Sequence, residues 1–275
     1  MISLQDRPSA VTADAETVGL LRLFNKSVSK QQKYREVVAM LGSTDGLCCL
    51  DIGADNGVIS YLLRQRGGMW KSADLDEQTV QAIRRLVKTD VYRIDGQAMP
   101  FADGEFDRVV ILDLLEHIHT DRQFMREVAR VLKPDGEVII NVPHFKNTLL
   151  RRFRLALGQT DERHGHVRPG YTLESLKAMM GDGFVVEQHN TYSRFFSELI
   201  DVLIRQAVDL VKGKAPAESQ KGAIVTGEDV GANQQMLKLY SLIYPVVCLF
   251  SRLDNLLFFT SGYMLIVKAR LNGRS

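Results

Sequence analysis

The chain has 275 residues, of which 45% are hydrophobic and 25% charged, enough to bury a full core in one domain with an elaboration. Its net charge of +2 is too small to indicate a nucleic-acid-binding protein by itself. The three cysteines, Cys48, Cys49 and Cys248, show neither metal-ligand nor redox spacing, and the first residues lack a secretory signal pattern. We therefore expect a cytoplasmic protein with reduced thiols.

The first expected element is a helix over residues 17–41. Apolar residues recur there at helical spacing, and the opposite face carries Arg22, Lys26, Lys30 and Lys33. Residues 1–45 are therefore predicted to form an amphipathic helical cap.

Short apolar runs then alternate with helical patterns. The runs are typical of buried strands and occupy residues 47–53, 69–75, 91–96, 108–115, 137–143 and 184–190. Helical patterns fall between most of them, at residues 56–67, 76–88, 121–133 and 172–183. This order predicts an α/β fold with a doubly wound parallel sheet and helices on both faces.

The stretch LDIGADNG, residues 50–57, links the first expected strand to a helix. In a doubly wound sheet, ligands bind at the carboxyl ends of strands, near the point where the strand order reverses. Gly53 and Gly57 allow a sharp turn and a close approach of a ligand to the backbone. Asp51, at the tip of the strand, is placed to accept hydrogen bonds from a ligand.

Several motifs in this order resemble the class I S-adenosylmethionine-dependent methyltransferases. They are LDIGADNG, SADLD, RIDGQAMPFADGEFDRVVILDLLEHI and VLKPDGEVIINVP, followed near the C-terminus by GYMLIVKAR. The subgroup is the type 11 methyltransferase domain, which contains quinone, small-lipid and glycolipid methyltransferases. The resemblance implies a Rossmann-like, seven-stranded, mostly parallel sheet with an antiparallel last strand, built from residues 46–191 and 262–275.

The resemblance also implies S-adenosylmethionine as the cofactor and S-adenosylhomocysteine as the product, and because methyl transfer by displacement requires no metal, none is expected. The implied cofactor-binding residues lie in the glycine-rich turn and after the second, third and fourth strands. They are Asp51, Gly53, Ala54, Asp55, Gly57, Asp74, Leu75, Asp95, Gly96, Gln97, Asp113 and Leu114. Asp74 would bind the ribose hydroxyls, residues 95–97 would lie beside the adenine, and Asp113 would face the methionine end.

Asp55 departs from the family pattern, which has glycine at this position of the turn. Aspartate tolerates a left-handed backbone better than most residues, so the turn can still form. Its carboxylate either contacts the sulfonium or amino group of the cofactor or caps the following helix, which Asn56 would help to begin.

Methyl transfer from a sulfonium is an in-line displacement, so alignment is the main contribution expected from the protein. A hydroxyl acceptor also needs a general base, most naturally histidine. The catalytic candidates are His144, which ends the fifth strand, and His166, in the loop before residue 172. His117, Arg168 and Tyr171 are candidates for substrate binding, although His117 could be structural and Arg168 a solvated loop charge.

Residues 192–261 form an insertion between the last two expected strands. Its apolar runs are too short to span a bilayer, and Pro245, Arg252 and Asp254 interrupt them. One interpretation is a helical lid over an apolar acceptor pocket. The other is a surface that lies on the inner face of the cytoplasmic membrane, aided by the basic and apolar segment 145–158.

The leading functional hypothesis is methylation of an oxygen on a small or amphiphilic acceptor: a lipid, a lipid-linked sugar, a quinone or a phenol. An RNA methyltransferase is an alternative, but the chain shows no aromatic stacking platform and no nucleic-acid partner is expected. A protein that binds the cofactor or a lipid without catalysis is the third possibility.

Overall fold

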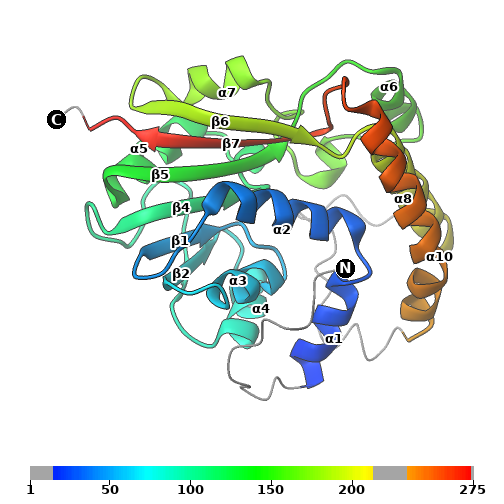
Figure 1. Cartoon of the computed structure of the whole chain (residues 1–275), viewed down its shortest axis with the longest axis horizontal. Helices are drawn as coiled ribbons and strands as arrows, with labels where there is room; N and C mark the ends of the chain where they lie inside the picture. The colour runs from blue at the N-terminus through cyan, green and yellow to red at the C-terminus, as the bar shows by residue number, and fades with distance from the viewer. Residues whose placement is uncertain (1–14, 213–233, 274–275) are drawn as a thin grey trace.

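The computed structural model describes residues 15–212 and 234–273. A single twisted sheet crosses the molecule, and helices cover both of its faces (Figure 1). The strands are β1 Cys48–Ile52, β2 Met69–Asp74, β3 Val91–Arg93, β4 Phe106–Leu112, β5 Leu132–Pro143, β6 Phe184–Tyr192 and β7 Met264–Leu271.

The strand order is β3-β2-β1-β4-β5-β7-β6. Neighbouring strands pair in parallel along the sheet from β3 through β2, β1 and β4 to β5. Strand β7 runs antiparallel to both β5 and β6. This confirms the predicted mostly parallel, seven-stranded sheet with an antiparallel last strand. The order reverses between β1 and β4, so a crevice is expected beyond their carboxyl ends.

Two apolar clusters hold the helices against the sheet. The helices are α1 Ala15–Phe24, α2 Val28–Leu41, α3 Val58–Arg64, α4 Glu77–Val87, α5 Asp121–Val131, α6 Leu149–Ala156, α7 Leu173–Met180, α8 Phe195–Lys212 and α10 Gln234–Leu253, with 3-10 turns η1 Leu115–His117, η2 Glu162–His164 and η3 Asp254–Leu257. Helices α1 to α3 pack into one cluster, and α5 and α7 into the other. The periodic burial explains why these segments form helices.

The single helix expected over residues 17–41 is two helices, and that prediction is wrong in this respect. A turn at residues 25–27 separates α1 from α2. The Ser27 hydroxyl accepts a hydrogen bond from the amide of Lys30 at 3.4 Å and so caps α2. Because α2 begins at this turn, its residues Lys30 and Lys33 lie next to Asp55 and Asp113, at the carboxyl ends of β1 and β4.

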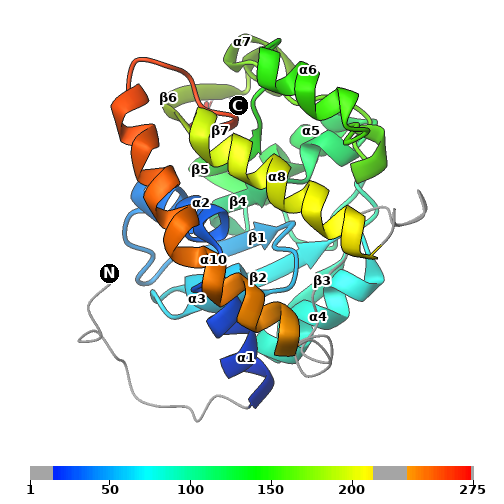
Figure 2. The same cartoon turned by 90° about the vertical axis from the view of Figure 1, so that its right-hand side faces the viewer.

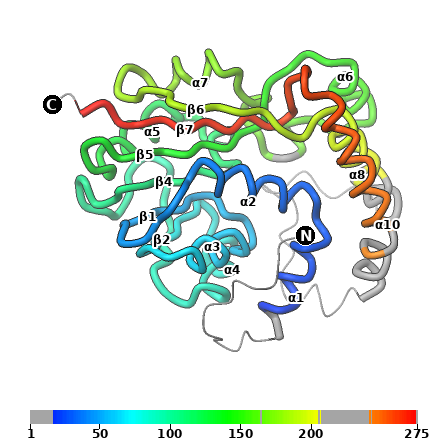
Figure 3. Tube along the Cα trace, viewed as in Figure 1, coloured from blue at the N-terminus to red at the C-terminus, as the bar shows by residue number. Residues whose placement is uncertain are grey.

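The insertion between β6 and β7 consists of α8, α10 and η3 among its described residues. Figure 3 shows the chain leaving β6 and returning to β7 through these helices, beyond the carboxyl ends of the parallel strands. Pro245, expected to break the apolar segment, lies inside α10. Its ring is exposed, where water can replace the backbone hydrogen bond that proline cannot donate.

No helix within residues 15–212 and 234–273 is long and apolar enough to cross a membrane. The three cysteines, all in this part of the chain, are free thiols, as predicted. Residues 1–14 of the predicted N-terminal cap and residues 213–233 of the predicted insertion lie outside the described residues.

Candidate active site

A cavity of about 420 Å³ opens at the carboxyl ends of β1 and β4. Its floor is formed by the ends of these strands, and its walls include residues of α2, α8 and α10. The volume lies within the range of small-molecule sites, and the position is the reversal point of the strand order.

Six of the predicted site residues line this cavity. They are Gly53, Ala54, Asp55, Asp113, His117 and His166. They come from the turn after β1, from the end of β4, from η1 and from the segment after η2. The fold thus brings the expected methionine end together with two of the candidate histidines.

The tight turn after β1 is required by the sheet itself. Gly53 has a φ of 84°, and a Cβ there would overlap the Leu112 carbonyl oxygen of β4. The side chain of Leu114, also predicted at this site, is fully buried in the core. Gly57 lets α3 approach α4, since a Cβ there would lie 2.8 Å from the Ile83 Cα.

Asp51 lies outside the lining of the cavity. Its side chain is fully buried and absent from the cavity wall, and its oxygens accept hydrogen bonds from Ser60 at 2.5 Å and Ser72 at 2.7 Å. Arg64 lies 3.4 Å away as a counter-ion. Burial raises the pKa of Asp51, which Arg64 and the two hydroxyls partly offset. Asp51 therefore ties β1 to α3 and β2.

Asp55 does not cap α3. The capping position is Gly57, which makes no side-chain capping bond, and the Asn56 side-chain oxygen is 3.5 Å from the Val58 amide. Asp55 has a φ of 55°, and its half-exposed carboxylate lies 2.8 Å from the ammonium of Lys30. Aspartate therefore replaces glycine in the left-handed conformation and adds a negative charge to the cavity wall.

A chain of polar contacts fixes Asp113 at the end of β4. Lys33 of α2 is paired with its carboxylate, and Asn141 donates to the same group at 2.6 Å. Tyr192 in turn donates to Asn141 at 2.6 Å. Burial alone would lower the pKa of Lys33, but the Asp113 carboxylate outweighs it and the pKa is raised. Lys33 thus keeps its charge inside the site.

The residues expected beside the ribose and adenine lie at the ends of β2 and β3, outside the lining of the cavity. Asp74 is fully buried, and one of its oxygens accepts from the Asp76 amide at 3.0 Å. A Cβ on Gly96 would lie 3.3 Å from the Leu75 side chain. Asp74, Leu75 and Gly96 therefore gather on the β2 and β3 side of the reversal point.

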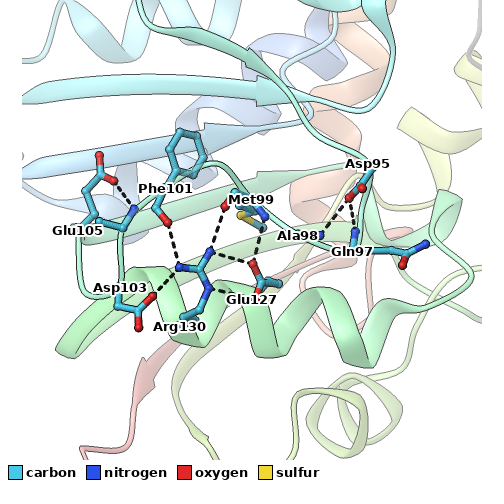
Figure 4. Close-up of polar contacts among 10 residues, drawn as sticks. Asp95, Gln97, Ala98, Met99, Phe101, Asp103, Glu105, Glu127 and Arg130 are labelled. Carbon is cyan, nitrogen blue, oxygen red and sulfur yellow. Dashed lines mark hydrogen bonds and ion pairs between the residues drawn. The ribbon is translucent and has the colours of Figure 1, made fainter.

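Asp95 shapes its own turn (Figure 4). Its exposed carboxylate accepts from the amides of Ala98 at 3.0 Å and Gln97 at 2.8 Å. These hydrogen bonds lower the pKa of Asp95. The turn thereby presents Asp95 and Gln97 at the end of β3.

Arg130 of α5 clamps the same loop from below, a role that the sequence pattern did not predict (Figure 4). Its guanidinium donates to the carbonyl oxygens of Met99 at 3.0 Å and Phe101 at 2.9 Å, and it pairs with Asp103 at 2.6 Å. Glu127 pairs with Arg130 and accepts from the Met99 amide. The loop after β3 is therefore held at several points.

The two catalytic candidates occupy different places. His144 lies on a smaller neighbouring cavity, where its Nδ1 donates to the Gly262 carbonyl at 2.9 Å and burial lowers its pKa. His166 lines both cavities. Its ring meets that of His117 edge-to-face, with centroids 4.8 Å apart. His166 thus lies closer to the predicted transfer site than His144 does.

Arg168 and Tyr171, expected to bind substrate, are structural. Arg168 pairs with Asp121 and donates to the Ile118 carbonyl at 2.6 Å. The buried Tyr171 hydroxyl donates to Asp121 at 2.8 Å, and burial raises its pKa. Both side chains therefore anchor the loop to the start of α5 and are absent from the cavity lining.

The polar groups at this edge of the sheet fit an adenosyl cofactor. Carboxylates lie at the ends of β2, β3 and β4, and a glycine turn follows β1. The hydroxyl and amino groups of such a cofactor would therefore find hydrogen-bond acceptors along one edge of the sheet.

Comparison with known proteins supports this assignment. Residues 50–140 match the family model of a methyltransferase domain. Residues 50–140 of this chain are therefore a methyltransferase domain. The recognition from sequence motifs is confirmed, and the family implies S-adenosylmethionine as its cofactor.

The relatives are similar over part of their length. A demethylmenaquinone methyltransferase from Tropheryma whipplei is 28% identical over 109 residues, 38% of this chain and 46% of that protein. A ubiquinone biosynthesis O-methyltransferase from Idiomarina loihiensis is 31% identical over 107 residues, 36% of this chain and 44% of that protein. The chain thus matches less than half the length of these curated relatives.

Solved structures share the fold over most of the chain. An S-adenosylmethionine-dependent methyltransferase from Mesorhizobium loti has a TM-score of 0.51 at 16% identity, covering 89% of this chain and 98% of its own. The [4+2]-cyclase SpnF has a TM-score of 0.54 at 19% identity, covering 88% and 82%. At these identities the likeness shows the fold alone.

We predict that Gly53→Ala is destabilising because of its neighbour and not only because of its backbone conformation. Gly158 has a φ of 78° but nothing within 4 Å of the position that a methyl group would take, so Gly158→Ala is the matched control. The control should cost about 1–2 kcal/mol, and overlap with Leu112 should add at least about 2 kcal/mol for Gly53→Ala. Urea unfolding measures both, and equal losses would contradict the packing role of Gly53.

Proposed function

We propose that the protein transfers a methyl group from S-adenosylmethionine to an oxygen atom of a small or amphiphilic acceptor. The observation that carries this proposal is the extent of the cavity. It reaches from Gly53 and Asp113 at the strand ends to the inner faces of the insertion helices. One cavity can therefore hold a polar cofactor end and an apolar acceptor.

The chain supplies separate groups for each part of the cofactor. Asp74 and the turn at Asp95 serve the ribose and adenine side, and Asp113 serves the methionine end. When bound, the cofactor supplies a methyl group on a positively charged sulfur. Asp55 and Asp113 add negative charge on that side, while Lys30 and Lys33 offer cations to a carboxylate.

The acceptor side carries apolar residues between polar ones. Ile200 and Ile204 of α8 and Ile243 and Val247 of α10 line the cavity opposite the strand ends, and Ser197, Glu198, Asp201, Tyr244 and Ser251 of the same helices line it too. The apolar residues can pack against an amphiphilic acceptor and align it with a reactive methyl group. The names of the curated relatives, which refer to demethylmenaquinone and ubiquinone, agree with an amphiphilic ring acceptor.

The acceptor hydroxyl would lie beside Glu116, His117 and His166. These three residues line the cavity together, and the imidazoles can assist the loss of the hydroxyl proton. His144 is the weaker candidate because it lies on the neighbouring cavity.

The test is methyl release with labelled S-adenosylmethionine and either a cellular lipid extract or total RNA. We expect turnover with the lipid extract, and a loss of about 10²–10⁴-fold for His166→Gln. The exposed His119 provides the control His119→Gln, which should retain activity. Turnover with RNA alone would favour the RNA alternative, and cofactor binding without turnover on either extract would favour a non-catalytic protein.

We further propose that the outer face of the insertion contacts a membrane. Figure 2 shows α6, α8 and α10 side by side on one face, and α8 contacts both of the others. Most exposed large hydrophobic side chains among the described residues lie on or next to these helices. They are Phe145, Leu149, Phe153, Leu155, Phe195, Leu203, Val246, Leu249, Phe250, Leu256, Phe258 and Phe259.

The charges on this face suit anionic lipid. Arg152 on α6 and Arg252 on α10 are exposed. The acidic Glu198 and Asp254 are buried, and Asp254 accepts from the amides of Arg194 and Phe196 at the start of α8. Exposed phenylalanines beside arginines are typical of interfacial membrane contact.

The membrane contact is tested by flotation with vesicles of phosphatidylglycerol and phosphatidylcholine. Phe258 and Phe259 are 77% and 74% exposed, so Phe258→Ser with Phe259→Ser should reduce the bound fraction at least about 10-fold. The matched control is Met69→Ser with Val185→Ser, two exposed residues outside the insertion and α6. A wild-type chain that stays with the soluble fraction at low salt would overturn the membrane contact, as would equal losses in both double variants.

A further inference from the structure

Glu116, His117 and His166 form a compact cluster on the cavity wall. One potential ligand atom from each lies within 4.8 Å of the others. Glu116 is almost completely buried, and the two histidines are half-buried. A carboxylate and two imidazoles that converge in a cavity are a ligand set that binds divalent transition metals.

The backbone holds the cluster in place from both sides. The Val167 amide donates to the Glu116 carbonyl at 2.8 Å, which joins the His166 segment to η1. The His166 amide donates to the Asp161 carbonyl at 3.1 Å. Two segments that are far apart in sequence are therefore fixed against each other before any ligand binds.

The orientation of His117 suits metal binding. Its Nδ1 lies 3.0 Å from the Gly165 carbonyl oxygen, which can only accept, so the proton is on Nδ1. The lone pair is then on Nε2. A hydrogen bond from the second ring nitrogen to a carbonyl is the usual support of a metal-bound histidine.

We propose that Glu116, His117 and His166 bind a divalent transition metal ion of the zinc type, with open coordination positions toward the cavity. Ligand atoms about 2.1 Å from a tetrahedral zinc ion lie about 3.4 Å apart, so separations of up to 4.8 Å in the cluster must close by at most about 1.4 Å, which side-chain rotation can supply. This binding does not depend on methyl transfer.

The ion deepens the proposed function, and this part of the inference rests on that function. A cation at this position faces the space assigned to the acceptor hydroxyl. It would lower the pKa of a bound hydroxyl, as zinc lowers that of bound water. His166 would then serve as a ligand instead of a base, and the acceptor hydroxyl would lose its proton to solvent water in the open cavity.

The metal site is tested with Co²⁺, a spectroscopic substitute for zinc, on the full chain without an added polyhistidine segment and after removal of metals. We expect one Co²⁺ per chain with a visible absorption band. Zn²⁺ should abolish the band, and Mg²⁺ should leave it unchanged because magnesium prefers oxygen ligands. The readout requires neither cofactor nor acceptor, so it is separable from a failure of methyl transfer.

The variants are Glu116→Gln and His166→Asn, with His119→Asn as the control, an exposed histidine close to the cluster in sequence. Each cluster variant should weaken Co²⁺ binding by more than about 10-fold, the low end of the loss seen for residues that merely support a ligand. Thermal unfolding of each variant without metal shows whether it folds. A lack of stoichiometric binding by the wild type, or folded cluster variants that bind as tightly as His119→Asn, would overturn the site.

Discussion

The close approach of β1 and β4 is the constraint on which the site depends. Gly53 turns the chain where a Cβ would overlap the Leu112 carbonyl, so the two strand ends can lie side by side. The strand order reverses at this pair, and the helices that follow the strands diverge to opposite faces of the sheet. The cavity exists because these helices leave the strand ends uncovered.

Charge organises the edge of this cavity. Asp55 and Asp113 stand on adjacent loops, and Lys30 and Lys33 of α2 pair with them. Paired charges in a partly buried site are costly to leave unmatched, so α2 is held over the strand ends. The insertion completes the enclosure, with both apolar and polar residues toward the cavity and an apolar face toward the outside.

Much of the fold followed from local pattern, because apolar runs of strand length alternate with amphipathic helices. The break between α1 and α2 did not, since the apolar spacing continues through it and only the capping Ser27 marks the turn. Motif position correctly placed Gly53, Asp74 and Asp113 at the carboxyl ends of β1, β2 and β4. It could not separate Asp51, a buried partner of Ser60 and Ser72, from a ligand-binding carboxylate.

Long-range contacts explain the remaining differences. Arg168 and Tyr171 were expected at the acceptor because they stand in a loop beside histidines, but both are used by Asp121 of α5. Arg130 and Lys33 were not expected at the site, because a basic residue on an amphipathic helix is usually solvated. Their partners, the carbonyls of Met99 and Phe101 and the Asp113 carboxylate, are contributed by distant segments of the chain.

The central claim is that the ends of β1, β2 and β4 bind an adenosyl cofactor, and calorimetric titration with S-adenosylhomocysteine tests it most directly. The wild type should bind one molecule per chain, and Asp74→Asn should bind at least about 10-fold more weakly, since a hydrogen bond to a charged group contributes about 1.5–3 kcal/mol. Asp135→Asn, at the opposite end of β5, should bind as the wild type does. No binding by the folded wild type, or equal affinity in all three proteins, would contradict the account.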